Sequence, residues 1–183
     1  MSVTLVLGGA RSGKSRYAES LLRSHPAVTY VAPGAVPDGS DPEWAERISL
    51  HRARRPAQWS TLETTEIAGV IAAARHPVLI DCLSTWLTRL IDDINAWGDR
   101  GRATSHVEKE SVRLLDALGC AKVDVILVTN EVGCSVVPST ASGRMFRDAL
   151  GRLNAAVSAA SDHVALVVAG RVLDLSDAPV IGH

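Results

Sequence analysis

The glycine-rich stretch near the start of this 183-residue sequence has the residue types and spacing needed to bind phosphate. Residues 8–15 read GGARSGKS and fit the pattern G-x-x-x-x-G-K-[ST], between an apolar run and a helix-forming segment. The glycines let backbone N–H groups converge on phosphate oxygens at a helix N-terminus, Lys14 reaches the β- and γ-phosphates, and Ser15 offers a hydroxyl to Mg²⁺. The alternative is a tight turn before an exposed lysine. The predicted nucleotide-binding loop comprises Gly8, Gly9, Ala10, Arg11, Ser12, Gly13, Lys14 and Ser15.

An acidic side chain is needed beside such a loop to hold Mg²⁺. Asp81 closes the apolar run HPVLID and is expected at the carboxyl edge of the sheet, where open α/β sheets bind ligands. We therefore predict that Ser15 and Asp81 hold the metal. The alternative is that Asp81 only caps the helix beginning near Leu83. Asn130 and Glu131 end the next apolar run at the same edge, either as ligand contacts or as a polar turn.

A histidine among arginines forms the second group that could do chemistry. It lies in residues 43–59, EWAERISLHRARRPAQW. Asp41–Pro42 is a typical helix start, with an N-cap followed by proline at the first helical position. The step Arg55–Pro56 should end the helix, because a residue before proline avoids the α region. A helix over 42–54 therefore carries His51 together with Arg47, Arg52 and Arg54, and Arg55 follows it directly.

Helical spacing places His51 between an apolar stripe, with Trp44 and Ile48, and a cationic stripe, with Arg47 and Arg54. Nearby cations disfavour protonation, so the imidazole should keep a free lone pair and can act as a nucleophile. The arginines can bind a triphosphate and stabilise charge on a transferring phosphoryl group. This arrangement would suit a covalent phosphoramidate intermediate. A purely structural histidine on an amphipathic helix is the alternative, and the spacing leaves both open.

The elements that must position these residues alternate between strand and helix. The apolar runs show no polar alternation, which is typical of strands buried on both faces of a parallel sheet. Expected strands cover 3–7, 28–32, 77–81, 123–129 and 163–169, and expected helices cover 14–24, 42–54, 63–74, 83–96, 105–119 and 141–161. Residues 172–175 can add an antiparallel edge strand, and 95–105 is interpreted as a mobile loop. The prediction is one α/β domain over residues 1–183.

Composition narrows the possible partners. The net charge is −1 and aromatic residues make up 4%, which disfavours a nucleic-acid-binding surface. No apolar run reaches membrane-spanning length and the N-terminus does not resemble a signal peptide, so a cytoplasmic protein is expected. The cysteines are too widely spaced for a disulfide framework or a zinc site. They are Cys82, Cys120 and Cys134.

Five segments together resemble the bifunctional adenosylcobinamide kinase / adenosylcobinamide-phosphate guanylyltransferase family of cobalamin biosynthesis. They are GGARSGKS (8–15), RISLHRARRPAQWSTLE (47–63), LIDCLSTWLTRL (79–90), VTNEVG with VP (128–138) and RMFRDALGRLNAAVSAASDHVALVVAG (144–170). The resemblance implies a RecA-like P-loop fold. It also implies phosphorylation of adenosylcobinamide by ATP or GTP, followed by transfer of GMP from GTP through a guanylylated His51. It further implies a homo-oligomer, with a trimer favoured.

The same resemblance carries nucleotide contacts onto particular positions. These are Gly8 to Ser15, Ala32, Pro33, Gly34, Arg52, Ala53, Arg54, Arg55, Glu63 and Asp81. Pro33 and Ser135 depart from the family pattern: Pro33 lacks an N–H donor, and Ser135 replaces a glycine. The competing hypotheses are a P-loop kinase for another small alcohol with His51 structural, and a nucleotide-dependent binding module.

Overall fold

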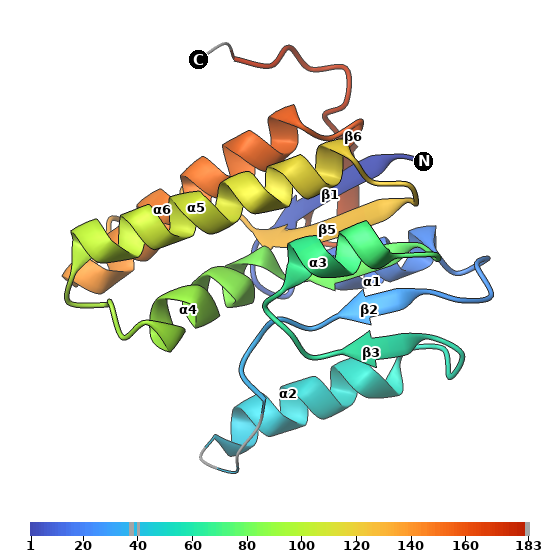
Figure 1. Cartoon of the computed structure of the whole chain (residues 1–183), viewed down its shortest axis with the longest axis horizontal. Helices are drawn as coiled ribbons and strands as arrows, with labels where there is room; N and C mark the ends of the chain where they lie inside the picture. The colour runs from blue at the N-terminus through green and yellow to red at the C-terminus, as the bar shows by residue number, and fades with distance from the viewer. Residues whose placement is uncertain (37–38, 40, 182–183) are drawn as a thin grey trace.

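A seven-stranded sheet forms the centre of the domain in the computed structural model (Figure 1), which describes residues 1–36, 39 and 41–181, apart from the side chains of Trp44 and Arg47. The strand order is β3-β2-β4-β5-β1-β6-β7. All neighbouring strands are parallel except β6 and β7, which form an antiparallel hairpin. The strands are β1 Val3–Gly8, β2 Thr29–Val31, β3 Ser60–Leu62, β4 Val78–Asp81, β5 Val125–Asn130, β6 His163–Val168 and β7 Arg171–Asp174. The predicted mostly parallel sheet with a C-terminal hairpin is confirmed.

Helices link these strands and cover both faces of the sheet. They are α1 Lys14–Leu21, α2 Pro42–Ala53, α3 Ile67–Ala73, α4 Leu83–Asp93, α5 Arg100–Gly119 and α6 Ala141–Ala159. Among the described residues, no helix combines the length and the apolar character that a bilayer span requires.

Two sequence predictions about elements were wrong. The loop expected over 95–105 is too long, because α5 already begins at Arg100, where the Asp99 carboxylate accepts a hydrogen bond from the backbone N–H of Arg102 at 3.0 Å. Strand β3 was missed, since its three residues are all exposed and carry no apolar run. The helix expected over 63–74 consequently begins only at Ile67.

Continuous apolar strands form here because both faces of the sheet are buried. Leu5 and Ile80 pack on the face covered by α3, α4, α5 and α6, whereas Val6 and Leu79 pack on the face covered by α1. Figure 1 shows α3 and α5 in front of the sheet and α1 behind it. Successive side chains on a strand point to opposite faces, so a run without polar alternation requires this double covering.

The carboxyl ends of the central strands meet at one edge, where the predicted chemistry lies. Gly8 at the end of β1 is level with Asn130 at the end of β5, and Asp81 at the end of β4 pairs with Val128. Helix α2 lies alongside β3 (Figure 1). His51, in the last turn of this helix, lies beside Asp81 at the carboxyl edge.

Candidate active site

The P-loop is shaped by its backbone and braced by the C-terminal hairpin. Gly13 has φ of 100°, a left-handed conformation that favours glycine, and it precedes α1 directly. The backbone N–H of Gly170, in the turn between β6 and β7, donates to the carbonyl of Ser12 at 2.9 Å. The Lys14 ammonium donates to the carbonyl of Gly9 at 3.2 Å, and Lys14 is only 6% exposed. The lysine is therefore held over the loop.

Asp81 forms the centre of a polar cluster at the end of β4. Its side chain is 8% exposed, and its Oδ2 accepts a 2.6 Å hydrogen bond from the Tyr30 hydroxyl. Burial acts to raise the pKa of Asp81, but the nearby His51 imidazole, the hydrogen bond from Tyr30 and the Ser15 hydroxyl outweigh it, and the pKa is lowered. Asp81 is thus an ionised carboxylate beside the P-loop serine. It does not cap α4, whose N-cap is Cys82.

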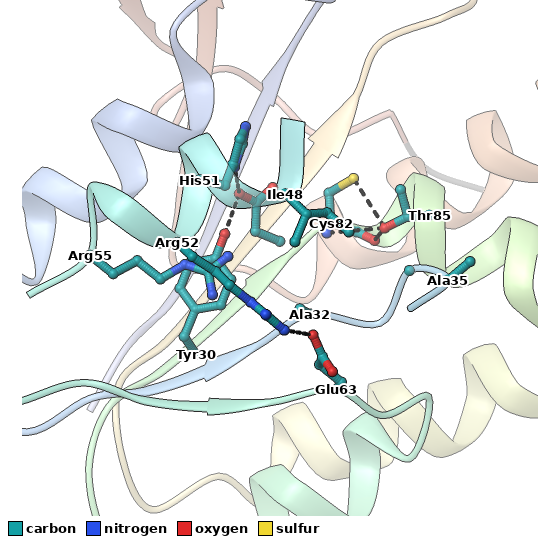
Figure 2. Close-up of a pocket in the computed structure, with 12 residues that line it drawn as sticks. Tyr30, Ala32, Ala35, Ile48, His51, Arg52, Arg55, Glu63, Cys82 and Thr85 are labelled. Carbon is teal, nitrogen blue, oxygen red and sulfur yellow. Dashed lines mark hydrogen bonds and ion pairs between the residues drawn. The ribbon is translucent and has the colours of Figure 1, made fainter. Parts of the chain in front are cut away.

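His51 lies between two hollows of the surface. One is the cleft along the P-loop, lined by Lys14 and Ser15 together with Arg54. The other, drawn in Figure 2, is lined by His51 together with Tyr30 and Glu63, among others. A group transferred to the imidazole is therefore within reach of both spaces.

A carboxylate lies beside the imidazole, which the expected position between an apolar and a cationic stripe did not include. His51 Nδ1 lies 3.6 Å from Asp81 Oδ2, and the imidazole is 24% exposed. A carboxylate beside Nδ1 favours a proton on that nitrogen, which leaves the lone pair of a neutral imidazole on Nε2. Ile48 lines the second hollow with His51, whereas the side chains of Trp44 and Arg47, predicted to flank the histidine, lie outside the described residues.

The other arginines of the predicted phosphate cluster have acidic or aromatic partners. Arg52 forms an ion pair with Glu63, and Arg54 lies 3.3 Å from the buried carboxylate of Glu19. The Arg55 guanidinium lies 3.4 Å from the centre of the Tyr30 ring, as Figure 2 shows from the side. These contacts hold the end of α2 and the residues just after it against α1, β2 and the segment that follows β3. An incoming phosphate would have to share these arginines with their present partners.

The structure brings most of the predicted site residues together. The P-loop residues Arg11 to Ser15 line the first cleft with His51 and Arg54. The second hollow contains Ala32, Gly34, Arg52, Arg55, Glu63 and Asp81. Gly8, Gly9 and Ala10 form the start of the loop itself.

Four predicted contacts are not brought into these hollows. Pro33 is buried and Ala53 is exposed on α2, and their contacts with nucleotide stay predictions. The Glu131 carboxylate accepts a hydrogen bond from the backbone N–H of Gly133, and the Asn130 carbonyl accepts one from the Asn154 amide. Both interactions are compatible with a polar turn, and contact of Asn130 and Glu131 with a ligand stays a prediction.

Two residues of the cluster could not have been found from the sequence. Tyr30 is the middle residue of the apolar run VTYVA and looks like an ordinary core position, while Glu19 looks like an exposed helix residue. Only the packing of β2 and α1 beneath α2 gives these residues their roles.

The glycine-rich loop between β1 and α1, on a parallel sheet with an acidic residue at the neighbouring strand end, defines a P-loop nucleotide-binding domain. The fold is similar to a solved structure described as a prototypical ATPase from the type III secretion system of pathogenic bacteria. That match has a TM-score of 0.58 and 13% sequence identity, and covers 90% of this chain and 50% of the other. It shows the fold alone.

Residues 4–175 match the family described as "Cobinamide kinase / cobinamide phosphate guanyltransferase". The chain is 39% identical to the bifunctional adenosylcobalamin biosynthesis protein CobU of Salmonella typhimurium, over 91% of this chain and 95% of that protein. It is 40% identical to the bifunctional adenosylcobalamin biosynthesis protein CobP of Pseudomonas aeruginosa, over 96% of this chain and 98% of that protein. The chain belongs to the cobinamide kinase / cobinamide phosphate guanyltransferase family.

Proposed function

We propose that this chain catalyses two successive reactions in cobalamin biosynthesis: phosphorylation of adenosylcobinamide and transfer of GMP to the resulting phosphate. Family membership supports both activities. The structural observation that carries the proposal is the place of His51, which lines the P-loop cleft and the hollow behind it, with the Asp81 carboxylate at Nδ1. A kinase that used only the P-loop would not require a histidine in this position.

The first reaction is transfer of the γ-phosphoryl group of ATP or GTP to a substrate hydroxyl. The P-loop N–H groups and Lys14 would hold the phosphates. Ser15 and Asp81 are the residues suited to Mg²⁺, because an ionised carboxylate and a serine hydroxyl lie together beside the loop. Within the described residues no group of three or more His, Cys, Asp or Glu gathers, which fits a metal held mainly by phosphate and water. The ion would neutralise charge on the phosphates.

The second reaction passes GMP through His51. The Nε2 lone pair attacks the α-phosphorus of GTP, a P–N bond forms, and the bond to the bridging oxygen breaks so that pyrophosphate leaves. The phosphate of adenosylcobinamide phosphate then attacks the same phosphorus and the P–N bond breaks. The products are adenosylcobinamide-GDP and free His51. We assign the nucleotide contacts of this step to Ala32, Pro33, Gly34, Arg52, Ala53, Arg54, Arg55 and Glu63.

The proposal also covers the small molecules that the protein binds, its oligomeric state and its location. Adenosylcobinamide, a corrinoid, and the nucleotides ATP and GTP are the small-molecule partners, and no nucleic acid takes part. A homotrimer in the cytoplasm is the proposed state, on the resemblance to the family. Sedimentation equilibrium of the purified chain would test the trimer.

Covalent labelling tests the proposed function. The protein is incubated with α-labelled GTP and Mg²⁺ without corrinoid, denatured, and examined for label that is labile in acid and stable in base. Labelled protein is expected, and its absence would contradict the guanylyl-histidine step and favour a small-molecule kinase with a structural histidine. His51→Ala should abolish the label while GTP still binds, and Lys14→Ala should weaken GTP binding. His76→Ala is the control, because His76 is exposed and precedes β4 at the opposite edge of the sheet.

A further inference from the structure

Tyr30 lies beneath the histidine and is 1% exposed, in the middle of β2. Its hydroxyl donates a 2.6 Å hydrogen bond to Oδ2 of Asp81. Its ring packs in the apolar cluster beneath α1, with the Arg55 guanidinium stacked over the ring at 3.4 Å. The phenol is therefore fixed on both sides, by the core below and by the arginine above (Figure 2).

The oxygen that Tyr30 binds is the one that faces the histidine. His51 Nδ1 is 3.6 Å from Asp81 Oδ2, slightly beyond a hydrogen bond in the free protein, and such contacts often shorten when substrate binds. A carboxylate can rotate about its last torsion and present either oxygen. The short bond from Tyr30 restricts this rotation and keeps Oδ2 pointed toward Nδ1.

We propose that Tyr30 is a positioning residue for guanylylation, acting through Asp81 to hold His51 with Nδ1 protonated and Nε2 free to attack. This inference rests on the proposed transfer of GMP to His51. Tyr30 does not touch the reacting atoms. Its role is to fix the orientation and tautomer of the imidazole, because a histidine with the proton on Nε2 has no lone pair to offer there.

A merely structural role predicts a different set of effects. If the hydroxyl only satisfied a buried carboxylate, its loss would lower stability and leave the imidazole unchanged. If it positions the imidazole, its loss slows attack while nucleotide binding is kept, because the P-loop contacts are made by other residues. The tautomer of His51 is a second, independent readout.

Tyr30→Phe keeps the buried ring and removes only the hydroxyl. Tyr17→Phe is the matched control, because Tyr17 packs against the same apolar cluster from α1 and makes the same chemical change away from Asp81. The label from α-labelled GTP is followed in a single turnover at saturating GTP. Tyr30→Phe should slow labelling by about tenfold, the loss expected for one hydrogen bond, and change the GTP dissociation constant by less than about twofold. Tyr17→Phe should label at the wild-type rate.

The outcomes separate this inference from the proposed function. If the wild-type protein is not labelled, the proposed function fails. If it is labelled and Tyr30→Phe is labelled at the same rate, only the positioning role fails. ¹⁵N spectra of the neutral His51 imidazole in the wild-type protein provide a test that does not depend on the variant folding. A proton on Nδ1 is expected, and a proton on Nε2 would overturn the inference.

Discussion

The P-loop and the C-terminal end of α2 line the same cleft but are held in place differently. The P-loop is held by its backbone: Gly13 is left-handed, and the Gly170 N–H supports the loop through the Ser12 carbonyl. The end of α2 is held by side chains, among them the pair between Arg54 and Glu19. The P-loop is therefore held by backbone conformation and a backbone hydrogen bond, whereas the position of the histidine depends on side-chain contacts with other elements.

The largest loss of nucleotide binding and of stability should come from disturbing the P-loop, which is held by its backbone. A Cβ at Gly8 would lie 2.5 Å from the Ser12 hydroxyl oxygen and 2.6 Å from the carbonyl of Val167, so the strand and the loop must move. Gly8→Ala should abolish measurable nucleotide binding and lower the free energy of unfolding by about 1–3 kcal/mol. Urea unfolding and titration with GTP measure both.

Gly9→Ala is the matched control, because a Cβ there meets no heavy atom within 4 Å. Its free energy of unfolding should stay within about 0.5 kcal/mol of wild type. Equal free energies of unfolding for Gly8→Ala and Gly9→Ala would contradict the claim that close backbone packing at Gly8 holds the loop in place.

The end of α2, which is held by side chains, should lose most stability when the ion pair between Arg54 and Glu19 of α1 is removed. Arg54→Met leaves the Glu19 carboxylate, 10% exposed, without this guanidinium. The free energy of unfolding should fall by about 1–3 kcal/mol, the cost of leaving a buried polar group unpaired. Adding Glu19→Gln to Arg54→Met should recover part of the loss. Strictly additive effects in this double-mutant cycle would show that the pair does not hold α2.

The stacked arginine offers a smaller and more specific change. Arg55→Lys keeps the positive charge but loses the planar group over Tyr30. Guanylylation should slow roughly twofold to fivefold, the size expected from a cation–π contact of this kind. Arg89→Lys, on α4 and paired with Asp93, is the control. An unchanged rate of guanylylation for Arg55→Lys would show that the stacking contact with Tyr30 does not contribute to the reaction.

The smallest expected effect is a difference between two carboxylates, Asp81 and Asp174, in how much each contributes to the loss of folding stability at low pH. Burial acts to raise the pKa of Asp81, but the His51 imidazole and the hydrogen bond from Tyr30 outweigh it and lower the pKa. Hydrogen bonds from Ser176 lower the pKa of Asp174. Both groups therefore stabilise the fold above their ordinary pKa of 3.8, and this stabilisation is lost as the pH falls through the lower folded value.

Urea unfolding between about pH 6 and pH 2 checks this difference. On acidification below about pH 4, the wild-type protein should lose more stability than Asp81→Asn does. Asp174→Asn should follow the wild-type curve more closely, because Asp174 is exposed on β7. Parallel curves for wild type and Asp81→Asn would contradict the buried, ionised carboxylate.

The same contrast explains how far the sequence could predict the structure. The P-loop motif, the doubly buried strands and the hairpin at 172–175 depend on local pattern, and the structure confirms them. The place of Asp81 at the sheet edge followed from the strand ending there. Strand β3 could not be predicted, because its three exposed residues form a strand only by pairing with β2.

The surroundings of His51 were predictable only in part. Helical spacing predicted arginines near His51, and Arg52, Arg54 and Arg55 line hollows with it. Spacing within one helix carries no information about side chains from β2, β4 and α1. The carboxylate at Nδ1 and the tyrosine behind it come from strands that are distant in sequence, at Asp81 and Tyr30. The interpretation from sequence therefore did not include the carboxylate beside the imidazole, and the catalytic role of His51 stays a prediction.

The central claim is that His51 carries GMP between the two reactions. Mass spectrometry of peptides tests it most directly, after incubation of the wild-type protein with GTP and Mg²⁺ and digestion under alkaline conditions that preserve a P–N bond. The account predicts a GMP adduct on His51, which disappears when adenosylcobinamide phosphate is added. An adduct on another residue, or no adduct when GTP is bound, would contradict it.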